Sequence, residues 1–192
     1  MRLYSISDEY VEFLRKKYPR IYSNKEDTRI HTRKYLGVVL EIDEYKFYIP
    51  LSSPKKHDYK DVDGKKTIRK DSLIVIRMIS YKNGEKELKG TLQIGTMIPV
   101  PDSEIELYDV GGEKDKQYRD LITEELIFIR KHKDKIKKSA RVLYSKKKAS
   151  NSDNAVVANC LDFIAVCSEC DKWIAEHGRW GDEWYYEKEN IC

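Results

Sequence analysis

A polar stretch at residues 50–57, PLSSPKKH, carries side chains that could hold an anion. It ends the apolar run GVVLEIDEYKFYIP, so Ser52, Ser53 and Lys55 stand at the end of a predicted strand. Hydroxyl and ammonium groups donate hydrogen bonds, and an ammonium group adds a full positive charge, which suits a phosphate. Pro54 fixes the backbone, and a turn there can swing one serine hydroxyl beside Lys55. Ser-Pro-Lys also occurs in ordinary turns, so both interpretations stay open on these residues alone.

The rest of the sequence lacks the common signatures of metal-dependent or nucleotide-driven catalysis. It contains no GxxxxGK[ST] phosphate loop, no GxSxG elbow and no acidic pair spaced for a magnesium ion. RNA can be cut without a metal, because its 2′-hydroxyl attacks the neighbouring phosphate once a base removes the proton. An acid serves the leaving 5′-oxygen, and cations stabilise the phosphorane. If the chain is a phosphodiesterase, we expect it to use neither a metal nor a cofactor.

Lysine and arginine gather in two segments, beyond what the net charge of +4 indicates. Residues 130–148 hold ten of them and one aspartate, and residues 55–70 form a second basic patch. Such surfaces neutralise phosphates and release counterions, so their affinity for nucleic acid falls with salt. A solvated lysine-rich helix is the alternative interpretation of the first segment. The candidates for RNA binding in it are Arg130, Lys131, Lys133, Lys135, Lys137 and Lys138.

The elements that must position these groups follow from the hydrophobic pattern. A first helix begins at a cap formed by Ser7 and stops at Pro19, with Tyr10, Phe13 and Leu14 on one face. Residues 55–70 have few apolar side chains and predict an exposed loop. The β-branched and aromatic runs predict strands at 35–40, 45–49, 73–79, 91–98 and 105–110. The first two thirds of the chain therefore predict a helix packed on a largely antiparallel sheet.

Beyond residue 116 the apolar period becomes helical. Residues 116–146 predict one long helix or a broken pair, and residues 155–176 predict a second helix that stops at Gly178. We predict one domain over residues 1–192, with about 179–192 as a C-terminal extension. With 40% hydrophobic and 36% charged residues the chain is expected to fold rather than to be disordered. Without an apolar run of about 18 residues or a signal sequence, it is expected in the cytoplasm, with no membrane partner.

The four cysteines all fall in the last fifth of the chain, which is unlike a disulfide framework. Cys167 and Cys170 form a CxxC pair, and with Cys160 and His177 they could be taken for zinc ligands. Positions 160, 163, 167, 170, 174 and 177, however, recur at three and four residues, which predicts the apolar stripe of one helix. We therefore interpret the cysteines as reduced, buried thiols.

Several blocks occur in an order and spacing that resembles the ToxN/AbiQ family of endoribonuclease toxins of type III toxin–antitoxin systems. The blocks are RLYSISDEYVEFL at 2–14, GVVLEIDEYKFYIPLSSPKK at 37–56, TMIPV at 96–100, ELYDVG at 106–111 and YRDLITEELIFIRKHKDKI at 118–136. The PL[ST]SPK element is the most specific of them. The resemblance covers about residues 1–136 and leaves the cysteine-rich helix and the tail after residue 178 unassigned.

The resemblance implies an α+β fold, with a compact, strongly twisted antiparallel sheet flanked by helices, similar to the barrels of other plasmid toxins. It also implies metal-independent cleavage of single-stranded RNA that leaves 2′,3′-cyclic phosphate and 5′-hydroxyl ends. The expected partners are cellular and phage RNA substrates and a small repeated pseudoknot RNA, the antitoxin, in a cyclic protein–RNA assembly. The expected role is phage defence by abortive infection. The rival interpretation is an RNA-binding or regulatory protein without catalytic activity.

The resemblance also implies roles for individual residues. Ser53 and Lys55, with Ser52, would hold and polarise the scissile phosphate. Tyr10 would line the groove, and Arg33 would keep a charge that a lysine carries in one relative. Arg29 stands where that relative has a tyrosine, so the place of the phenol stays open among Tyr35, His31 and His57. The further RNA-binding candidates are Lys56, His57 and Arg29.

Overall fold

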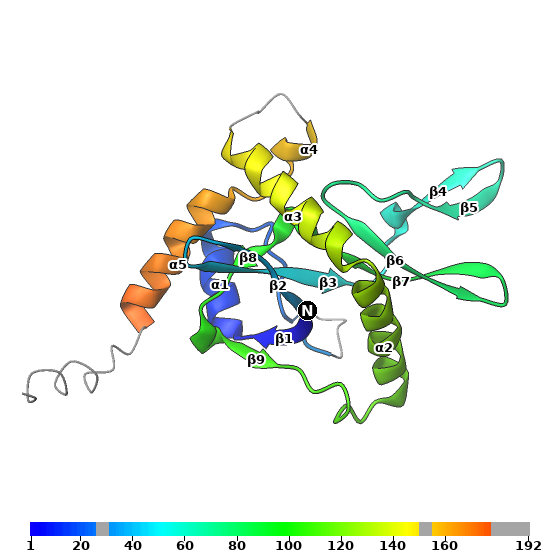
Figure 1. The fold of residues 1–192 in the computed structure, drawn as a ribbon, viewed down its shortest axis with the longest axis horizontal. Helices are drawn as coiled ribbons and strands as arrows, with labels where there is room; N and C mark the ends of the chain where they lie inside the picture. The colour runs from blue at the N-terminus through cyan, green and yellow to red at the C-terminus, as the bar shows by residue number, and fades with distance from the viewer. Residues whose placement is uncertain (26–30, 150–154, 178–192) are drawn as a thin grey trace, which may run out of the picture.

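An antiparallel sheet of seven strands runs through the centre of the part of the chain that the structure describes (Figure 1). The computed structural model describes residues 1–25, 31–149 and 155–177. The strands follow the spatial order β6-β7-β3-β2-β1-β9, and β8 pairs with β3. Their bounds are β1 Arg2–Ile6, β2 Tyr35–Ile42, β3 Tyr45–Ser52, β6 Ile76–Lys82, β7 Glu85–Leu92, β8 Ile98–Pro99 and β9 Ile105–Leu107.

The central hairpin was predictable, but several strand limits differ from expectation. The hairpin of β2 and β3 agrees with the predicted strands at 35–40 and 45–49. The strand β1 was not predicted, and it pairs with both β2 and β9. The predicted strand at 91–98 is wrong, because β7 ends at Leu92 and the chain turns through a 3-10 helix, η2, at Ile94–Thr96 before β8. The predicted strand at 73–79 is displaced, since β6 begins at Ile76.

The predicted loop at 55–70 is instead a short 3-10 helix followed by a second hairpin. The helix η1 spans Lys56–Asp58, and β4 (Tyr59–Val62) and β5 (Lys65–Ile68) form a separate two-stranded sheet. Asp63 and Gly64 both take positive φ, 54° and 73°, which is the turn chemistry that an Asp-Gly pair favours. This hairpin and the β6–β7 hairpin project from the same side of the molecule (Figure 1).

Helices cover the sheet, and three of them begin at a residue whose side chain accepts a backbone N–H, namely Ser7, Asp115 and Asp162. Their bounds are α1 Asp8–Lys17, α2 Lys116–Lys131, α3 Lys133–Lys148, α4 Ala155–Ala158 and α5 Phe163–His177, with η3 at Asp102–Glu104. The predicted helix at 116–146 is a broken pair that divides at His132. The single helix predicted over 155–176 is wrong, because a new helix starts after Asp162, whose side chain accepts a hydrogen bond from the Ala165 backbone at 3.1 Å. The predicted stop at Gly178 lies outside the described residues.

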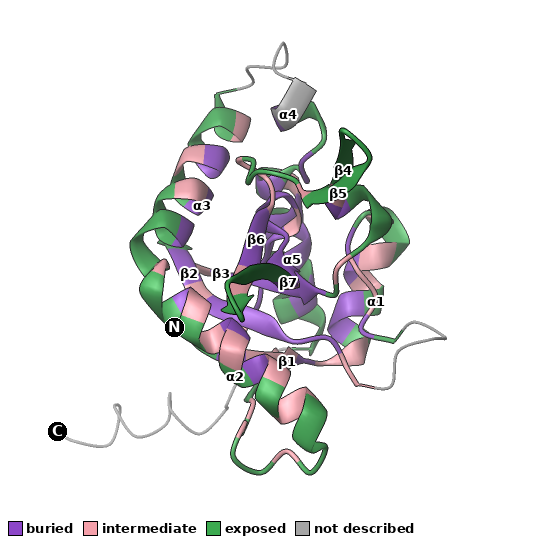
Figure 2. Cartoon of the chain, turned by 90° about the vertical axis from the view of Figure 1, so that its right-hand side faces the viewer, coloured by how far each residue is buried: buried purple, intermediate pink, exposed green. Residues whose placement is uncertain are grey.

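The core lies between the sheet and the helices, as the purple segments of Figure 2 show. In α1, Tyr10 and Leu14 are fully buried, and the Trp173 ring of α5 packs on Tyr10 with centroids 5.4 Å apart. Cys167 and Cys170 are free and buried in α5, whereas Cys160 is buried outside that helix, so the single stripe of cysteines is also wrong. Burial raises the pKa of the Cys170 thiol to about 11.

The described residues form neither a cluster of metal ligands nor a membrane-spanning helix. No three His, Cys, Asp or Glu side chains come together there in a way that could hold a metal ion. No helix among them is long and apolar enough to cross a membrane. The fourth cysteine, Cys192, and the rest of the tail lie outside the described residues.

Candidate functional site

Three strands meet in one row at the end of β3. Ser52 pairs with Thr91 of β7, and Thr91 pairs in turn with Arg77 of β6. The Thr91 hydroxyl donates to the Ser52 carbonyl at 3.3 Å and accepts from the Gln93 amide at 2.7 Å. Ser52 and Thr91 are buried, whereas Ser53 is exposed. The predicted pair of hydroxyls is therefore divided, with one in the sheet and the other facing solvent.

A tight turn follows Ser53 and presents Lys55. The Lys55 backbone N–H donates to Asp58 Oδ2 at 2.9 Å, and the Asp58 N–H donates to the Lys55 carbonyl, also at 2.9 Å. Lys55, Lys56 and His57 are all exposed. The sequence thus correctly placed an ammonium group just beyond the strand end, but the aspartate that holds its backbone was not predicted.

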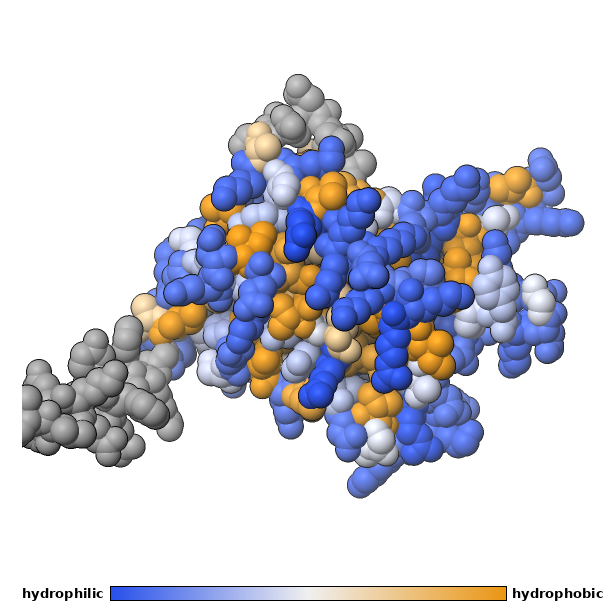
Figure 3. Space-filling model, viewed as in Figure 1, coloured by the Kyte–Doolittle hydropathy of each residue, from blue (hydrophilic) through white to orange (hydrophobic). Residues whose placement is uncertain are grey.

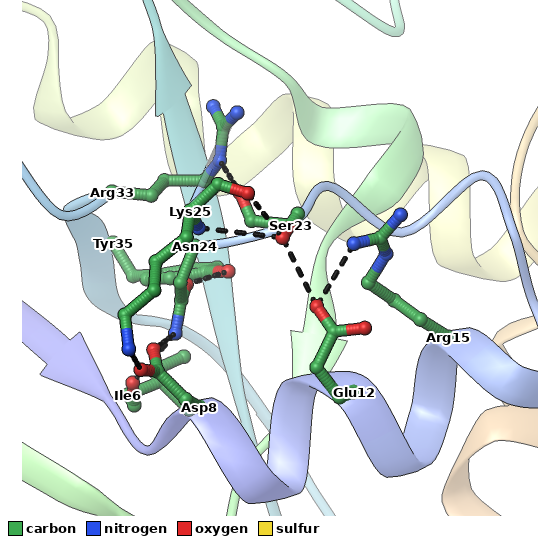
Figure 4. Close-up of polar contacts among 9 residues, drawn as sticks. All are labelled: Ile6, Asp8, Glu12, Arg15, Ser23, Asn24, Lys25, Arg33 and Tyr35. Atoms are coloured by element: carbon green, nitrogen blue, oxygen red, sulfur yellow. Dashed lines mark hydrogen bonds and ion pairs between the residues drawn. The ribbon is translucent and has the colours of Figure 1, made fainter. Parts of the chain in front are cut away.

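Arg33 is a buried side chain that joins the end of β3 to the segment after α1. Its side chain is fully buried, and its guanidinium donates to the Ser23 carbonyl at 3.0 Å and to the Leu51 carbonyl at 2.6 Å. Figure 4 shows the first of these hydrogen bonds. Because Leu51 immediately precedes Ser52, Arg33 fixes the last residues of β3 while its charge stays below the surface.

Tyr22 connects the two cations and was missed by sequence analysis. Its ring centroid lies 4.5 Å from Arg33 Cζ and 5.2 Å from Lys55 Nζ, within the range of cation–π attraction. Asn24, two residues further along the chain, donates to the Ile6 carbonyl at 2.8 Å, which ties this segment to β1 (Figure 4). Only the folded chain brings Tyr22 to Lys55, so no local pattern could have indicated it.

A hollow of about 440 Å³ opens beside Tyr22. Its lining includes the guanidinium-bearing Arg15 and Arg20 and the polar side chains of Gln93 and Thr96. Gln93 follows β7 directly and contacts Thr91, so the hollow adjoins the row that contains Ser52. A cleft with this lining offers cations and hydrogen-bond donors to a chain of phosphates.

Two of the predicted tyrosines are core residues. The Tyr10 hydroxyl donates to the Pro99 carbonyl at 2.6 Å, and burial raises the pKa of this phenol well above its ordinary value. The Tyr35 hydroxyl donates to Asn24 Oδ1 at 2.9 Å, and its side chain is buried (Figure 4). Since neither side chain is open to a ligand, we treat Tyr10 as a core residue and correct its expected place in a groove.

The remaining candidates lie at different places. His31 stacks on Tyr118 of α2 with centroids 3.8 Å apart, and its Nε2 is 3.1 Å from Asp115. His57 is exposed on the turn that carries Lys55. Arg29 lies outside the described residues.

The predicted basic surface lies on the end of α2 and the start of α3, where Figure 3 shows hydrophilic side chains gathered. All six predicted side chains are exposed, whereas Ile136 and Ala140 of the same helix are buried. Lys135 contacts Asp71 at 2.5 Å. Burial lowers the pKa of the N-terminal amine, and the charges of Lys133 and Lys137 lower it further. The electric field of α3 therefore reaches the start of β1.

A second hollow, of about 760 Å³, lies between α2 and the β6–β7 hairpin. Lys131 and Lys135 reach it, together with the aromatic side chains of Tyr81, Phe128 and His132. The rings of Phe128 and His132 lie 4.2 Å apart, and burial lowers the pKa of His132. Cations and aromatic faces together are typical of sites that bind single-stranded nucleic acid.

The protein has cations at the end of a strand of an antiparallel sheet and a lysine-rich helix. These features are typical of the class of proteins that bind nucleic acids. Residues 2–169 match the family described as "Toxin ToxN, type III toxin-antitoxin system". The chain therefore belongs to that family, which confirms the predicted resemblance and extends it into α5.

Curated relatives agree with this assignment. The chain is 32% identical over 164 residues to Endoribonuclease AbiQ of Lactococcus lactis subsp. lactis, covering 85% of this chain and 84% of that protein. It is 30% identical over 138 residues to Endoribonuclease ToxN of Pectobacterium atrosepticum, covering 71% and 75%.

Solved structures share the fold. AbiQ, described as a lactococcal anti-phage endoribonuclease of a type III toxin–antitoxin system, superposes with a TM-score of 0.73 at 26% identity, covering 91% of this chain and 98% of that chain. A toxin of a type III system described as inhibited by a non-coding RNA pseudoknot gives a TM-score of 0.72 at 23% identity, covering 90% and 96%. The predicted α+β fold with a mainly antiparallel sheet is confirmed.

Proposed function

We propose that this protein is an endoribonuclease that cuts single-stranded RNA at the end of β3. The observation that carries the proposal is the pair of exposed groups, Ser53 and Lys55, on a turn that the sheet row of Ser52 and Thr91 supports. The names of the relatives support it, because both are called endoribonucleases. We also propose that the whole chain acts as a single domain.

The chemistry we propose is attack of the RNA 2′-hydroxyl on its own phosphate. The 2′-oxygen forms a new bond to phosphorus, the bond to the 5′-oxygen breaks, and the products are a 2′,3′-cyclic phosphate and a 5′-hydroxyl. Ser53 donates a hydrogen bond to a non-bridging oxygen, and the Lys55 ammonium stabilises the extra negative charge of the phosphorane. Lys55 supplies a positive charge directly, and the nucleophile belongs to the RNA, so the proposed reaction uses no metal.

Proton transfer is assigned to His57. Among the three side chains considered for this role, Tyr35 is buried and His31 lies against Tyr118, whereas His57 is exposed two residues after Lys55. In this proposal the His57 imidazole accepts the proton of the attacking 2′-hydroxyl, and the leaving 5′-oxygen takes a proton from solvent water. Arg33 acts from below by holding the Leu51 carbonyl, and it does not touch the substrate in this scheme.

The proposed partner is an RNA antitoxin that covers the cleavage site at the end of β3 and the basic face of α3. A pseudoknot RNA inhibits one of the structural relatives, and six exposed basic side chains on α2 and α3 offer a surface for such an RNA. We further propose that the toxin and a small repeated pseudoknot RNA form a cyclic assembly in the cytoplasm. Release of the toxin would then expose cellular and phage RNA to cleavage.

Lys55→Ala and Lys56→Ala test the proposal as a matched pair, because both remove one exposed ammonium from the same turn. With saturating RNA in a single-turnover experiment, Lys55→Ala is expected to lower the cleavage rate by roughly 100-fold or more, since it removes the charge that stabilises the transition state. Lys56→Ala is expected to stay within about threefold of the unmodified protein. Equal rates for both variants, or tight RNA binding without cleavage by the unmodified protein, would contradict the proposed site.

A further inference from the structure

A buried ion pair joins the exposed basic segment after Ser53 to strand β6. Asp58 is 1% exposed and Arg77 is 7% exposed, and Asp58 Oδ1 lies 3.0 Å from Arg77 Nη2. The neighbours Lys56, His57 and Lys60 are exposed. A buried carboxylate is costly unless a cation and hydrogen bonds compensate it, and Asp58 has both, in the Arg77 guanidinium and the Lys55 N–H.

Asp58 holds Lys55 by both polar groups of its backbone. The Asp58 carboxylate accepts the Lys55 N–H, and the Asp58 N–H donates to the Lys55 carbonyl, each at 2.9 Å. The Asp58 carbonyl also accepts the Arg69 N–H at 2.9 Å, which closes the base of the β4–β5 hairpin. A two-stranded hairpin is marginally stable by itself in water, so this base depends on its anchors.

Arg77 connects that turn to the rigid sheet. It lies on β6 opposite Thr91, and Thr91 lies opposite Ser52, so the three residues share one row across three strands. The Arg77 side chain donates from Nη1 to the Lys70 carbonyl at 2.8 Å. The Arg77 backbone N–H donates to Asp71 Oδ1, also at 2.8 Å. The chain therefore leaves the row at Ser52, passes Lys55, and returns to the same row through the contact of Asp58 with Arg77.

We propose that Asp58 and Arg77 are positioning residues that hold the Lys55 turn at a fixed place relative to Ser52 and Ser53. The inference rests on the proposed function of Lys55. A phosphorane needs its cation at a defined place, whereas binding an RNA chain needs only positive charge nearby. Loss of the ion pair therefore lowers kcat and changes KM little.

A double-mutant cycle tests the inference. Asp58→Asn keeps the size of the side chain but removes the charge that faces Arg77. The matched control is Asp61→Asn, which makes the same change at an exposed aspartate of β4. We expect Asp58→Asn to lower kcat by about 10-fold or more with KM within about threefold, and Asp61→Asn to change neither. In the Lys55→Ala background, Asp58→Asn is expected to lower kcat by less than about twofold, because it acts through Lys55.

The outcome of the cycle distinguishes positioning from general stability. The positioning role is overturned if the double variant loses kcat by the product of the two single losses. It is also overturned if Asp58→Asn alone keeps the wild-type kcat. If Lys55→Ala itself cleaves at the wild-type rate, the proposed function fails instead. Should Asp58→Asn not fold, Arg77→Lys keeps a positive charge on β6 but loses the forked contact to Asp58 and Lys70, and it enters the same cycle with the same expectations.

Discussion

The end of β3 and the surface of α3 both carry cations, but they hold them differently. At the strand end, Arg33 is fully buried and donates hydrogen bonds to two backbone carbonyls. The backbone of Lys55 is held by hydrogen bonds with Asp58. On α3, the side chains of Lys133, Lys137 and Lys138 are exposed. Fixed groups meet the geometric needs of a transition state, whereas an array of solvated charges attracts a polyanion over a distance.

Under the proposed function, this difference corresponds to two tasks within one fold. Changes at the strand end should act on the rate of cleavage or on folding, because the groups there form a connected set. Changes on α3 should act on RNA affinity and its dependence on salt.

The largest expected effect on stability is that of replacing the buried Arg33, with the exposed Arg130 as its comparison. Arg33→Met leaves the Ser23 and Leu51 carbonyls without their donor, so we expect the free energy of unfolding to fall by about 2–4 kcal/mol. Arg130→Met removes an exposed charge and should change it by less than about 0.5 kcal/mol. Urea denaturation measures both, and a similar small loss in the two variants would show that Arg33 is not a structural clamp.

A second pair compares two glutamates of α2. Glu125 is 5% exposed, and burial raises its pKa to about 8, whereas Glu124 is in contact with Lys89 at the surface. Folded Glu125 thus keeps a proton that the unfolded chain has lost above its ordinary pKa of about 4.3. Stability therefore falls as the pH rises from about 4.3 to about 8 and does not change further above that range through this group.

Glu125→Gln removes this dependence. We expect it to stabilise the protein by about 1–3 kcal/mol at pH 8.5 and to have little effect near pH 4.5, since part of the gain is offset by a buried amide. Glu124→Gln should leave the pH dependence of stability unchanged. Thermal unfolding across this pH range measures both, and the same pH profile in Glu125→Gln as in the unmodified protein would contradict a protonated Glu125.

The smallest expected change per residue comes from the exposed lysines. Replacing Lys133, Lys137 and Lys138 together by glutamine should weaken RNA binding about 10-fold near 0.15 M salt and reduce the slope of log affinity against log salt by about 2. The cleavage rate at saturating RNA should stay within about twofold. Binding titrations at several salt concentrations measure the slope, and an unchanged slope would remove α3 from the RNA interface.

Local signals were sufficient for much of the fold. The Ser7 cap and the face of Tyr10, Phe13 and Leu14 predicted α1, and the same apolar face already indicated that Tyr10 is buried. The groove role for Tyr10 came only from the resemblance to the family. The β4–β5 hairpin could have been predicted from Asp63-Gly64, but the many charges of the segment obscured that signal.

For the proposed site, the sequence indicated the residues at the strand end but not the contacts that distant segments make with them. Ser52, Ser53 and Lys55 follow one another in the chain, so the end of an apolar strand was enough to indicate them. Tyr22, Arg77 and Thr91 reach this region only through cation–π, ion-pair and sheet contacts between distant segments, whereas Asp58 is local and was overlooked. Such contacts depend on the register of β3, β7 and β6, which the sequence alone does not define.

The most direct test of the central claim identifies the ends of the RNA fragments that the purified protein makes. A long unstructured RNA is incubated with the protein in excess EDTA, beside the Ser53→Ala variant. We predict discrete cuts with 2′,3′-cyclic phosphate and 5′-hydroxyl ends, and a loss of these cuts in the variant. Tight RNA binding without cuts, or cleavage that Ser53→Ala leaves unchanged, would contradict a catalytic site at the end of β3.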